Sequence, residues 1–343
     1  MTMYRNFFLT KEHPHYDHTS LLLYGMFTPS AEDSYSPMAL HSVSELKCEN
    51  RVKLHWPWVP YSELKPHYGR IEGFDFHSDY NTIGSGSVNG ILCLWMAFNS
   101  CPDMKILILW NPSIQEYKVI PSSFDSTCHV SYRGFGYDSR RDDYKVMCHK
   151  EVQGTYIWEI YSLRTNSWRI LDLNVHHMSL NCYGQLNVDG LSHWMCKSVT
   201  HNEKYLLSFD WSNEVFITTP MPSYIEDKNL DYCLVPKELV LLNGSIALIL
   251  HFLETTTFHI LVLGELRVKE SWTKMFIVGP ISFHMYPIGA GRNGDMVFCK
   301  KDGQFILFNL TTQSIEELSL KSKRFCKILI HRENLISFEQ KSI

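Results

Sequence analysis

The sequence has 343 residues, of which 45% are hydrophobic, 20% charged and 13% aromatic, and its formal net charge is −4. So weak a negative charge does not draw a protein to nucleic acid or to an anionic membrane, and we expect neither as a partner. The apolar runs are too short to span a bilayer, and the opening residues lack the apolar core of a secretory signal. Ten cysteines without regular spacing favour reduced thiols and a cytoplasmic and/or nuclear location.

The first part of the chain predicts few regular elements. Residues 1–19 are polar and irregular and are expected to form a linker-like segment. Two strand candidates follow, SLLLYGMF from Ser20 and MALHSVSEL from Met38. Residues 47–75 contain three prolines and several aromatic residues, so they predict a long connection with at most one strand.

After residue 80, short apolar runs alternate with polar turns, and two marks recur. The first mark is a tight-turn pair before an apolar strand, at Asn89-Gly90, Asp189-Gly190, Asn243-Gly244 and Asn293-Gly294. The second mark is an aromatic residue with a large apolar residue seven positions later, in the pairs Trp110/Tyr117, Tyr161/Trp168, Phe209/Phe216 and Phe308/Ile315. Leu263 and Trp272 continue this series with two extra residues. A period of about 50 residues with several strands per repeat is typical of a β-propeller.

Each repeat holds four strand-length runs; GFGY, YKVMCHKE, TYIWEIYSL and WRILDL are those of residues 134–173. The predicted fold is all-β, a β-propeller of four-stranded antiparallel blades that fills residues 20–343. Five blades are continuous in the sequence. The opening residues 20–46 and the tail after Leu320 predict two strands each. Pairing these strands in a sixth blade would close the ring and remove its exposed edges. A seventh blade is the alternative if residues 47–88 contain further strands.

The sequence contains a glycine pattern and adjacent carboxylates that can belong to catalytic or cofactor sites, but neither occurs in the structural context that such a site needs. Residues 289–294, GAGRNG, match the glycine pattern of a dinucleotide site, but that site needs a helix after the last glycine. The run DMVFCKK that follows predicts a strand. The adjacent carboxylates Asp142-Asp143 and Glu316-Glu317 are expected to be solvated turn residues. We therefore predict no catalytic residues and no cofactor, and we do not expect an enzyme.

A metal site is not expected either. The densest group of possible ligands is His176, His177, Cys182, His193 and Cys196. This group lacks the paired spacing of a zinc site, and His193 and Cys196 would point to opposite faces of one strand.

The aromatic residues fall into two groups. Those in phase with the repeat, including Trp110, Trp168 and Trp272, are expected to pack between blades. Those out of phase are better candidates for an interface, because exposed Trp and Tyr are favoured anchors. The predicted protein-binding residues are Trp56, Trp58, Tyr61, Tyr68, His176, His177 and Tyr224. The alternative for the first four is that their loop packs over the propeller.

Four motif blocks carry a resemblance to a known family. In order they are NGILCLW from Asn89, ILWNPSIQEYKVIP from Ile108, GFGYDSRRDDYKV from Gly134 and EIYSLRTNSWRIL from Glu159. They resemble the plant F-box-associated domain of type one, found in F-box/kelch-repeat and S-locus F-box proteins. The resemblance covers roughly residues 20–340 and implies kelch-like blades.

The resemblance also implies a function. In that family the associated domain captures a protein substrate, and the F-box binds a Skp-type adaptor in an SCF-type, cullin-RING ubiquitin ligase. The F-box has no counterpart in the sequence, and YRNFFLTKEH resembles the linker behind it. A Skp-type adaptor and a cullin are thus expected partners only if an F-box lies upstream.

The leading prediction is a protein-interaction module that presents loops to a protein target. One alternative is a sugar-binding or enzymatic propeller, since propellers host both functions. The other is a truncated, non-functional copy.

Overall fold

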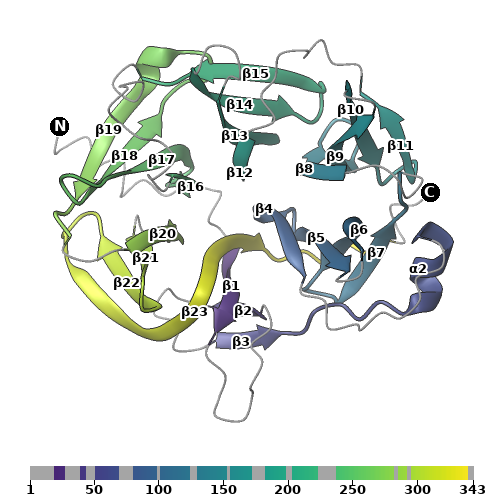
Figure 1. Ribbon diagram of the computed structural model, residues 1–343, viewed down its shortest axis with the longest axis horizontal. Helices are drawn as coiled ribbons and strands as arrows, with labels where there is room; N and C mark the ends of the chain where they lie inside the picture. The colour runs from purple at the N-terminus through teal and green to yellow at the C-terminus, as the bar shows by residue number, and fades with distance from the viewer. Residues whose placement is uncertain are drawn as a thin grey trace.

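The computed structural model describes residues 19–27, 39–43, 51–68, 80–98, 101–123, 130–152, 155–171, 182–197, 203–222, 237–281, 285–291 and 295–338. Most of these residues form antiparallel strands, and Figure 1 shows the resulting sheets arranged in a ring with their first strands toward the centre. The predicted all-β fold, a β-propeller with four-stranded antiparallel sheets, is confirmed.

Three sheets of four strands stand alone, and in each the strands follow one another in chain order. The first consists of β8 (Val130–Asp138), β9 (Asp143–Val152), β10 (Thr155–Ser162) and β11 (Ser167–Ile170). The second consists of β12 (Cys182–Val188), β13 (Leu191–Lys197), β14 (Lys204–Asp210) and β15 (Val215–Pro220). The third consists of β16 (Lys237–Leu242), β17 (Ser245–Phe252), β18 (Thr257–Leu263) and β19 (Trp272–Val278).

The remaining strands form one continuous sheet of eleven strands. Its members are β1 (Thr19–Phe27), β2 (Ala39–Val43), β3 (Arg51–Leu54), β4 (Asn81–Val88), β5 (Ile91–Phe98), β6 (Cys101–Asn111), β7 (Glu116–Ile120), β20 (Met285–Ala290), β21 (Asp295–Lys300), β22 (Gln304–Asn309) and β23 (Ile315–Arg332). The long strand β23 pairs with β22 through its first residues and with β1 through its last ones. A single parallel bridge between Ile330 and Gly86 joins β23 to β4.

The two ends of the described chain meet in one set of strands, in which the end of β23 pairs with β1, β1 with β2 and β2 with β3. If β23 is counted twice, the pairing of the described strands gives six sets of four. Three of these sets form one sheet, because two share β23 and the bridge from β23 to β4 adds the third. The number of blades therefore stays a prediction.

The strands that close the ring differ from the expected two from each end: three come from the beginning and one from the end of the described chain. Residues 333–338 form no second strand because they dock on the hairpin between β6 and β7. There the Asn111 side-chain amide donates to the Asn334 carbonyl oxygen at 2.9 Å, and the Phe338 N–H donates to Glu116 at 3.1 Å.

The strand register explains both repeating marks. The residues of each seven-position pair face each other across one hairpin: Trp110/Tyr117, Tyr161/Trp168, Phe209/Phe216 and Phe308/Ile315. Two positions before the second member, each described turn has a residue with φ between 48° and 59°: Gln115, Asn166, Glu214 and Gln313. The tight-turn pairs at residues 89, 189 and 243 also have positive φ at both positions, as the favoured two-residue hairpins require. Asn293-Gly294 lies outside the described residues.

The in-phase aromatic residues pack between neighbouring sets of strands, as expected. Trp110, Tyr161 and Phe209 are fully buried. The indole N–H of Trp168 donates to the Pro121 carbonyl oxygen at 2.8 Å, and that of Trp272 donates to the Pro220 carbonyl oxygen at 3.2 Å. Each indole thus joins its own sheet to the residue at the end of the preceding one.

One helix interrupts the predicted connection of residues 47–75. Helix α2 (Tyr61–Tyr68) lies beside β7 at the periphery of the ring (Figure 1). The sequence did not predict it, because eight residues with Leu64 alone fully buried give no helical period.

Candidate functional site

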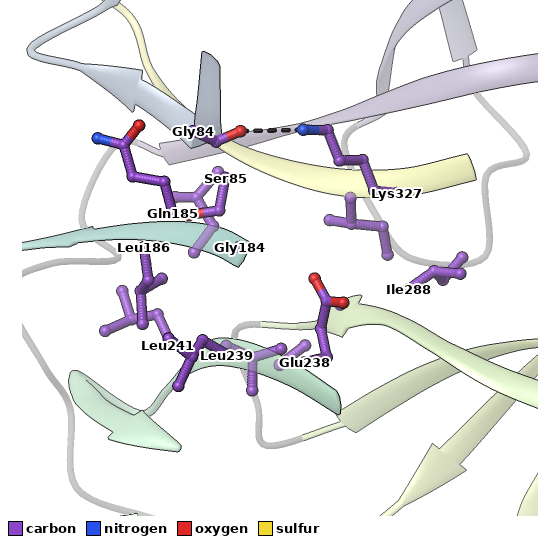
Figure 2. A pocket seen from close by; sticks show the side chains of 15 residues that line it. Gly84, Ser85, Gly184, Gln185, Leu186, Glu238, Leu239, Leu241, Ile288 and Lys327 are labelled. Carbon is purple, nitrogen blue, oxygen red and sulfur yellow. Dashed lines mark hydrogen bonds between the residues drawn. The ribbon is translucent and has the colours of Figure 1, made fainter. Parts of the chain in front are cut away.

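The first strands of the sets surround a central channel. A cavity of about 80 Å³ lies between β4, β12, β16, β20 and β23. Backbone atoms and aliphatic side chains form most of its lining. The lining includes glycine at positions 84, 184 and 289, which have no side chain to fill the space. Figure 2 shows two charged side chains in this channel, Glu238 from β16 and Lys327 from β23.

Lys327 and Glu238 do not pair with each other directly. The Lys327 ammonium group donates to the Gly84 carbonyl oxygen at 3.0 Å and lies 5.6 Å from the centre of the Tyr24 ring. Among the residues that the structure describes, no hydrogen bond or ion pair reaches the Glu238 carboxylate. The channel therefore holds two opposite charges with space between them.

Burial shifts the pKa of both groups toward their neutral forms. Removal from water raises the pKa of Glu238 to about 7, against the opposing attraction of Lys327. The same loss of water lowers the pKa of Lys327 to about 8, and the Glu238 charge opposes this shift. Both groups therefore change protonation near neutral pH.

Replacing Glu238 by glutamine should flatten the pH dependence of stability below pH 7. The carboxyl group titrates near 4.5 when unfolded and near 7 when folded, so the folded state holds the proton more tightly. Wild-type stability therefore falls as pH rises from about 4.5 to about 7, and Glu238→Gln should be more stable at pH 8 by about 3 kcal/mol. Urea unfolding at a series of pH values measures this difference.

The exposed turn residue Glu254 supplies the control. Glu254→Gln should follow the wild-type curve, because that side chain lies in solvent. Parallel curves for wild type and Glu238→Gln would show that the channel carboxyl group is not perturbed.

The channel opens on the face that carries the tight turns. A second cavity, of about 430 Å³, shares Ser85, Leu186, Leu241 and Ile330 with the first and extends to the turns at Asn89 and Asp189. A third hollow, of about 580 Å³, continues from it along Tyr137 and Arg332. This face, called the turn face below, is thus concave from the channel outward.

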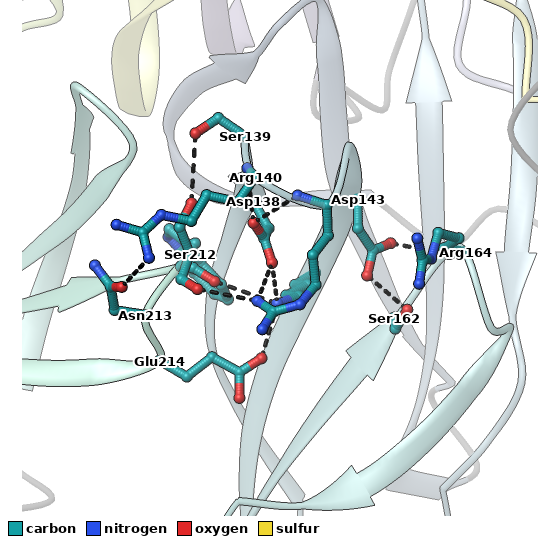
Figure 3. Close-up of polar contacts among 12 residues, drawn as sticks. Asp138, Ser139, Arg140, Asp143, Ser162, Arg164, Ser212, Asn213 and Glu214 are labelled. Carbon is teal, nitrogen blue, oxygen red and sulfur yellow. Dashed lines mark hydrogen bonds and ion pairs between the residues drawn. The ribbon is translucent and has the colours of Figure 1, made fainter.

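A polar network beside these cavities joins two sheets. Lys145 donates to Asp138 at 2.6 Å in its own sheet and to Glu214 at 2.7 Å in the sheet of β12–β15. Arg141 also contacts Asp138, at 2.9 Å, and Arg169 pairs with Glu214. In Figure 3 the network runs from Asp138, at the end of β8, to Glu214, in the turn between β14 and β15. The network fixes the angle between two sheets and leaves no open acid/base pair.

We expected Asp142 and Asp143 to be solvated turn residues, which is correct for Asp142 and wrong for Asp143. Asp142 is exposed, but Asp143 is buried, at 4% exposure. Its carboxylate accepts hydrogen bonds from the Ser162 hydroxyl at 2.6 Å and the Arg164 N–H at 2.9 Å. The carboxylate serves as a cap for the next hairpin, which explains its burial.

Two of the predicted interface aromatics pack into the protein. Trp56 lies within 5.5–6.2 Å, between ring centres, of Tyr24, Tyr80 and Trp110. The Tyr68 hydroxyl donates to the Ile120 carbonyl oxygen at 2.7 Å and accepts from the Leu107 N–H at 3.2 Å, and burial raises its pKa. For these two residues the structure shows the packing that was the alternative.

The other predicted aromatic residues differ in exposure. Tyr61 is half-buried against the same cluster, whereas 75% of Trp58 is exposed. His176, His177 and Tyr224 lie outside the described residues, so their role stays a prediction.

Other candidate motifs also take structural roles. The glycine pattern begins inside β20, which is a strand and not the helix that a dinucleotide site needs. Cys182 and Cys196 stand directly opposite each other on β12 and β13 and form a disulfide, contrary to the expected reduced thiols. Within the described ranges no group of three or more His, Cys, Asp or Glu side chains could hold a metal, and no helix is long and apolar enough to cross a membrane.

Glu238 and Lys327 were missed from the sequence. Both lie in strands that are mostly apolar, KELVLL and CKILIH, and charged residues near the start of such a strand are easily taken for edge residues. A usable signal was available, because polar residues on the first strand of a propeller repeat can face the channel.

The ring of four-stranded sheets around a central channel defines a β-propeller protein. Residues 62–338 match the model of the F-box associated beta propeller domain, and the chain belongs to this family. The resemblance noted in the motif blocks is thereby confirmed.

Two relatives from Arabidopsis thaliana illustrate the likeness. The F-box protein CPR1 is 26% identical over 277 residues, which cover 71% of this chain and 63% of CPR1. An F-box/kelch-repeat protein is 30% identical over 173 residues, covering 46% of this chain and 43% of that protein. The chain thus matches only about half the length of these relatives.

Among solved structures, hydrazine synthase of Kuenenia stuttgartiensis is 8% identical and has a TM-score of 0.48, with 97% of this chain and 49% of that one covered. A likeness of this size carries no argument about function.

Proposed function

We propose that this protein is a protein-interaction module that captures a protein target for an SCF-type, cullin-RING ubiquitin ligase and has no enzymatic activity of its own. The observation that carries the proposal is the family match over residues 62–338, together with the likeness to F-box proteins. The matched residues are the associated propeller, so contact with a Skp-type adaptor and a cullin would pass through an F-box upstream of it. The proposed place of action is the cytoplasm and/or the nucleus.

Trp58 is the side chain best suited to anchor a target. Its neighbours hold the loop in place: the Tyr80 hydroxyl donates to the Pro57 carbonyl oxygen at 2.7 Å, and Val59 is buried. The indole itself projects into solvent. An exposed Trp on a backbone that is already ordered offers contact area at a low cost in conformational entropy.

Replacing Trp58 by alanine should weaken target capture without unfolding the protein. We expect recovery of a true target to fall by about tenfold or more, since Trp is a frequent hot-spot residue. The measurement is quantitative mass spectrometry of proteins bound to the tagged full chain in plant cells, with target ubiquitination followed in parallel in cells that make the chain joined to an upstream F-box.

Leu335→Ala is the matched control, because Leu335 is also a large apolar side chain and is 79% exposed. A target should bind this variant as it binds the wild type, and its ubiquitination should rise with the amount of either protein. Identical recovery with all three proteins would remove Trp58 as the anchor. If no bound protein is ubiquitinated more, the ligase role itself is contradicted.

A further inference from the structure

The channel wall contains buried polar atoms that the described part of the protein leaves unsatisfied. The Gln185 side-chain oxygen and the Asn187 side-chain nitrogen are both buried without a hydrogen-bond partner, and Gln185 is only 9% exposed. Both face Gly84: a Cβ atom there would lie 3.5 Å from the Gln185 oxygen and 3.3 Å from the Asn187 nitrogen. Both atoms are inaccessible even with the channel empty, so they lie behind its surface, and only the groups that line the channel can contact an occupant.

The two charged side chains that line the channel define the chemistry of a molecule that could occupy it. Lys327 uses one described hydrogen bond, to the Gly84 carbonyl oxygen, and so has further N–H groups to donate. Glu238 accepts none from the described residues and points into the same space (Figure 2). A lone anion would meet the Glu238 charge and a lone cation would meet the Lys327 charge. A molecule with both charges would be attracted at each end and would add no net charge to a poorly solvated site.

We propose that the central channel binds a small zwitterion of the α-amino acid class, with its carboxylate toward Lys327 and its ammonium group toward Glu238. The space of about 80 Å³ limits the ligand to a small side chain. The larger turn-face cavity of about 430 Å³ shares four residues with the channel and gives the ligand its entry. This site is separate from Trp58 and does not depend on the proposed ligase role.

Isothermal titration of the full wild-type chain with glycine, L-alanine and L-serine tests the proposal. Propionate, which lacks the ammonium group, and ethylamine, which lacks the carboxylate, are the matched comparison compounds for L-alanine. We expect L-alanine to bind at least about tenfold more tightly than either of them, because each lacks one charged contact. No measurable heat with all three amino acids would overturn the proposal and leave water as the occupant.

Single substitutions assign each end of the ligand. Glu238→Gln should make L-alanine and propionate bind with equal affinity, and Lys327→Met should do the same for L-alanine and ethylamine. The exposed residues Glu254 and Lys321 supply the controls Glu254→Gln and Lys321→Met, which should bind as the wild type does. Circular dichroism establishes that each variant is folded. Folded channel variants that keep the wild-type preference would place the ligand elsewhere, and the titration of wild type decides the proposal even if a variant does not fold.

Discussion

Replacing Trp110 by alanine should lower the free energy of unfolding by about 3–5 kcal/mol, the usual cost of truncating a buried large aromatic residue. The Trp110 side chain is fully buried in β6 and packs against Trp56, with ring centres 5.8 Å apart. Its indole nitrogen has no hydrogen-bond partner among the described residues, so the loss comes from packing and from the cavity left behind. Chemical denaturation of the wild type and the variant measures the difference.

Trp58→Ala is the matched control, since it makes the same chemical change at a side chain that is 75% exposed. We expect its free energy of unfolding to stay within about 0.5 kcal/mol of the wild type. Equal losses for the two variants would mean that Trp110 does not lie in the core between β1 and β6.

Replacing Lys145 by methionine should cost about 3–5 kcal/mol at neutral pH, because it leaves the carboxylate of Asp138 buried with its main partner removed. Both side chains are nearly inaccessible: 4% of the Lys145 side chain is exposed and none of the Asp138 side chain. Lys145 uses its three donors on Asp138, Glu214 and the Trp211 carbonyl oxygen. Methionine fills similar space but satisfies none of these acceptors.

Arg141→Met tests whether burial decides this cost. Arg141 contacts the same oxygen of Asp138, but 54% of its side chain is exposed and solvent screens the pair, so we expect a much smaller loss than for Lys145→Met. A loss as large as that of Lys145→Met would show that the two cations contribute alike.

The Lys145 effect should also depend on pH. Burial alone would raise the pKa of Asp138, but hydrogen bonds from Lys145 and Arg141 outweigh it and lower the pKa to about 2. A carboxyl group with a lowered pKa stabilises the fold above about pH 4, and this contribution is lost as pH falls toward 2. The difference between wild type and Lys145→Met should therefore shrink over that range, and a constant difference would argue against this charge pair.

The repeating architecture could be predicted from the sequence because each hairpin requires particular residue types at a fixed spacing. Trp110 and Tyr117 are seven residues apart since a turn of fixed length places them opposite each other. Asn89 and Gly90 similarly mark a turn with positive φ at both positions. Such signals depend on neighbouring residues only, so they survive in a single sequence.

The closure of the ring and the lining of the channel depend on contacts between residues far apart in the sequence. Such contacts produce no pattern in the residues around either partner. Nothing near Asn334 indicates that it would bind Asn111, more than two hundred residues away. The sequence also could not show that Trp56 is packed and Trp58 exposed. The two residues lie in one short loop, and their burial depends on which distant residues contact them. Glu238 and Lys327 meet only once the ring is formed.

The pairing of Thr19 with Arg332 has a consequence for whatever is joined to this propeller. Arg332 lines both of the larger hollows of the turn face, so the polypeptide enters the ring at the rim of those hollows. An upstream module would therefore be tethered on the same side as the mouth of the channel, and its distance from anything seated there would depend on the length of chain that joins it to β1. Lengthening that tether would change how closely the two can approach.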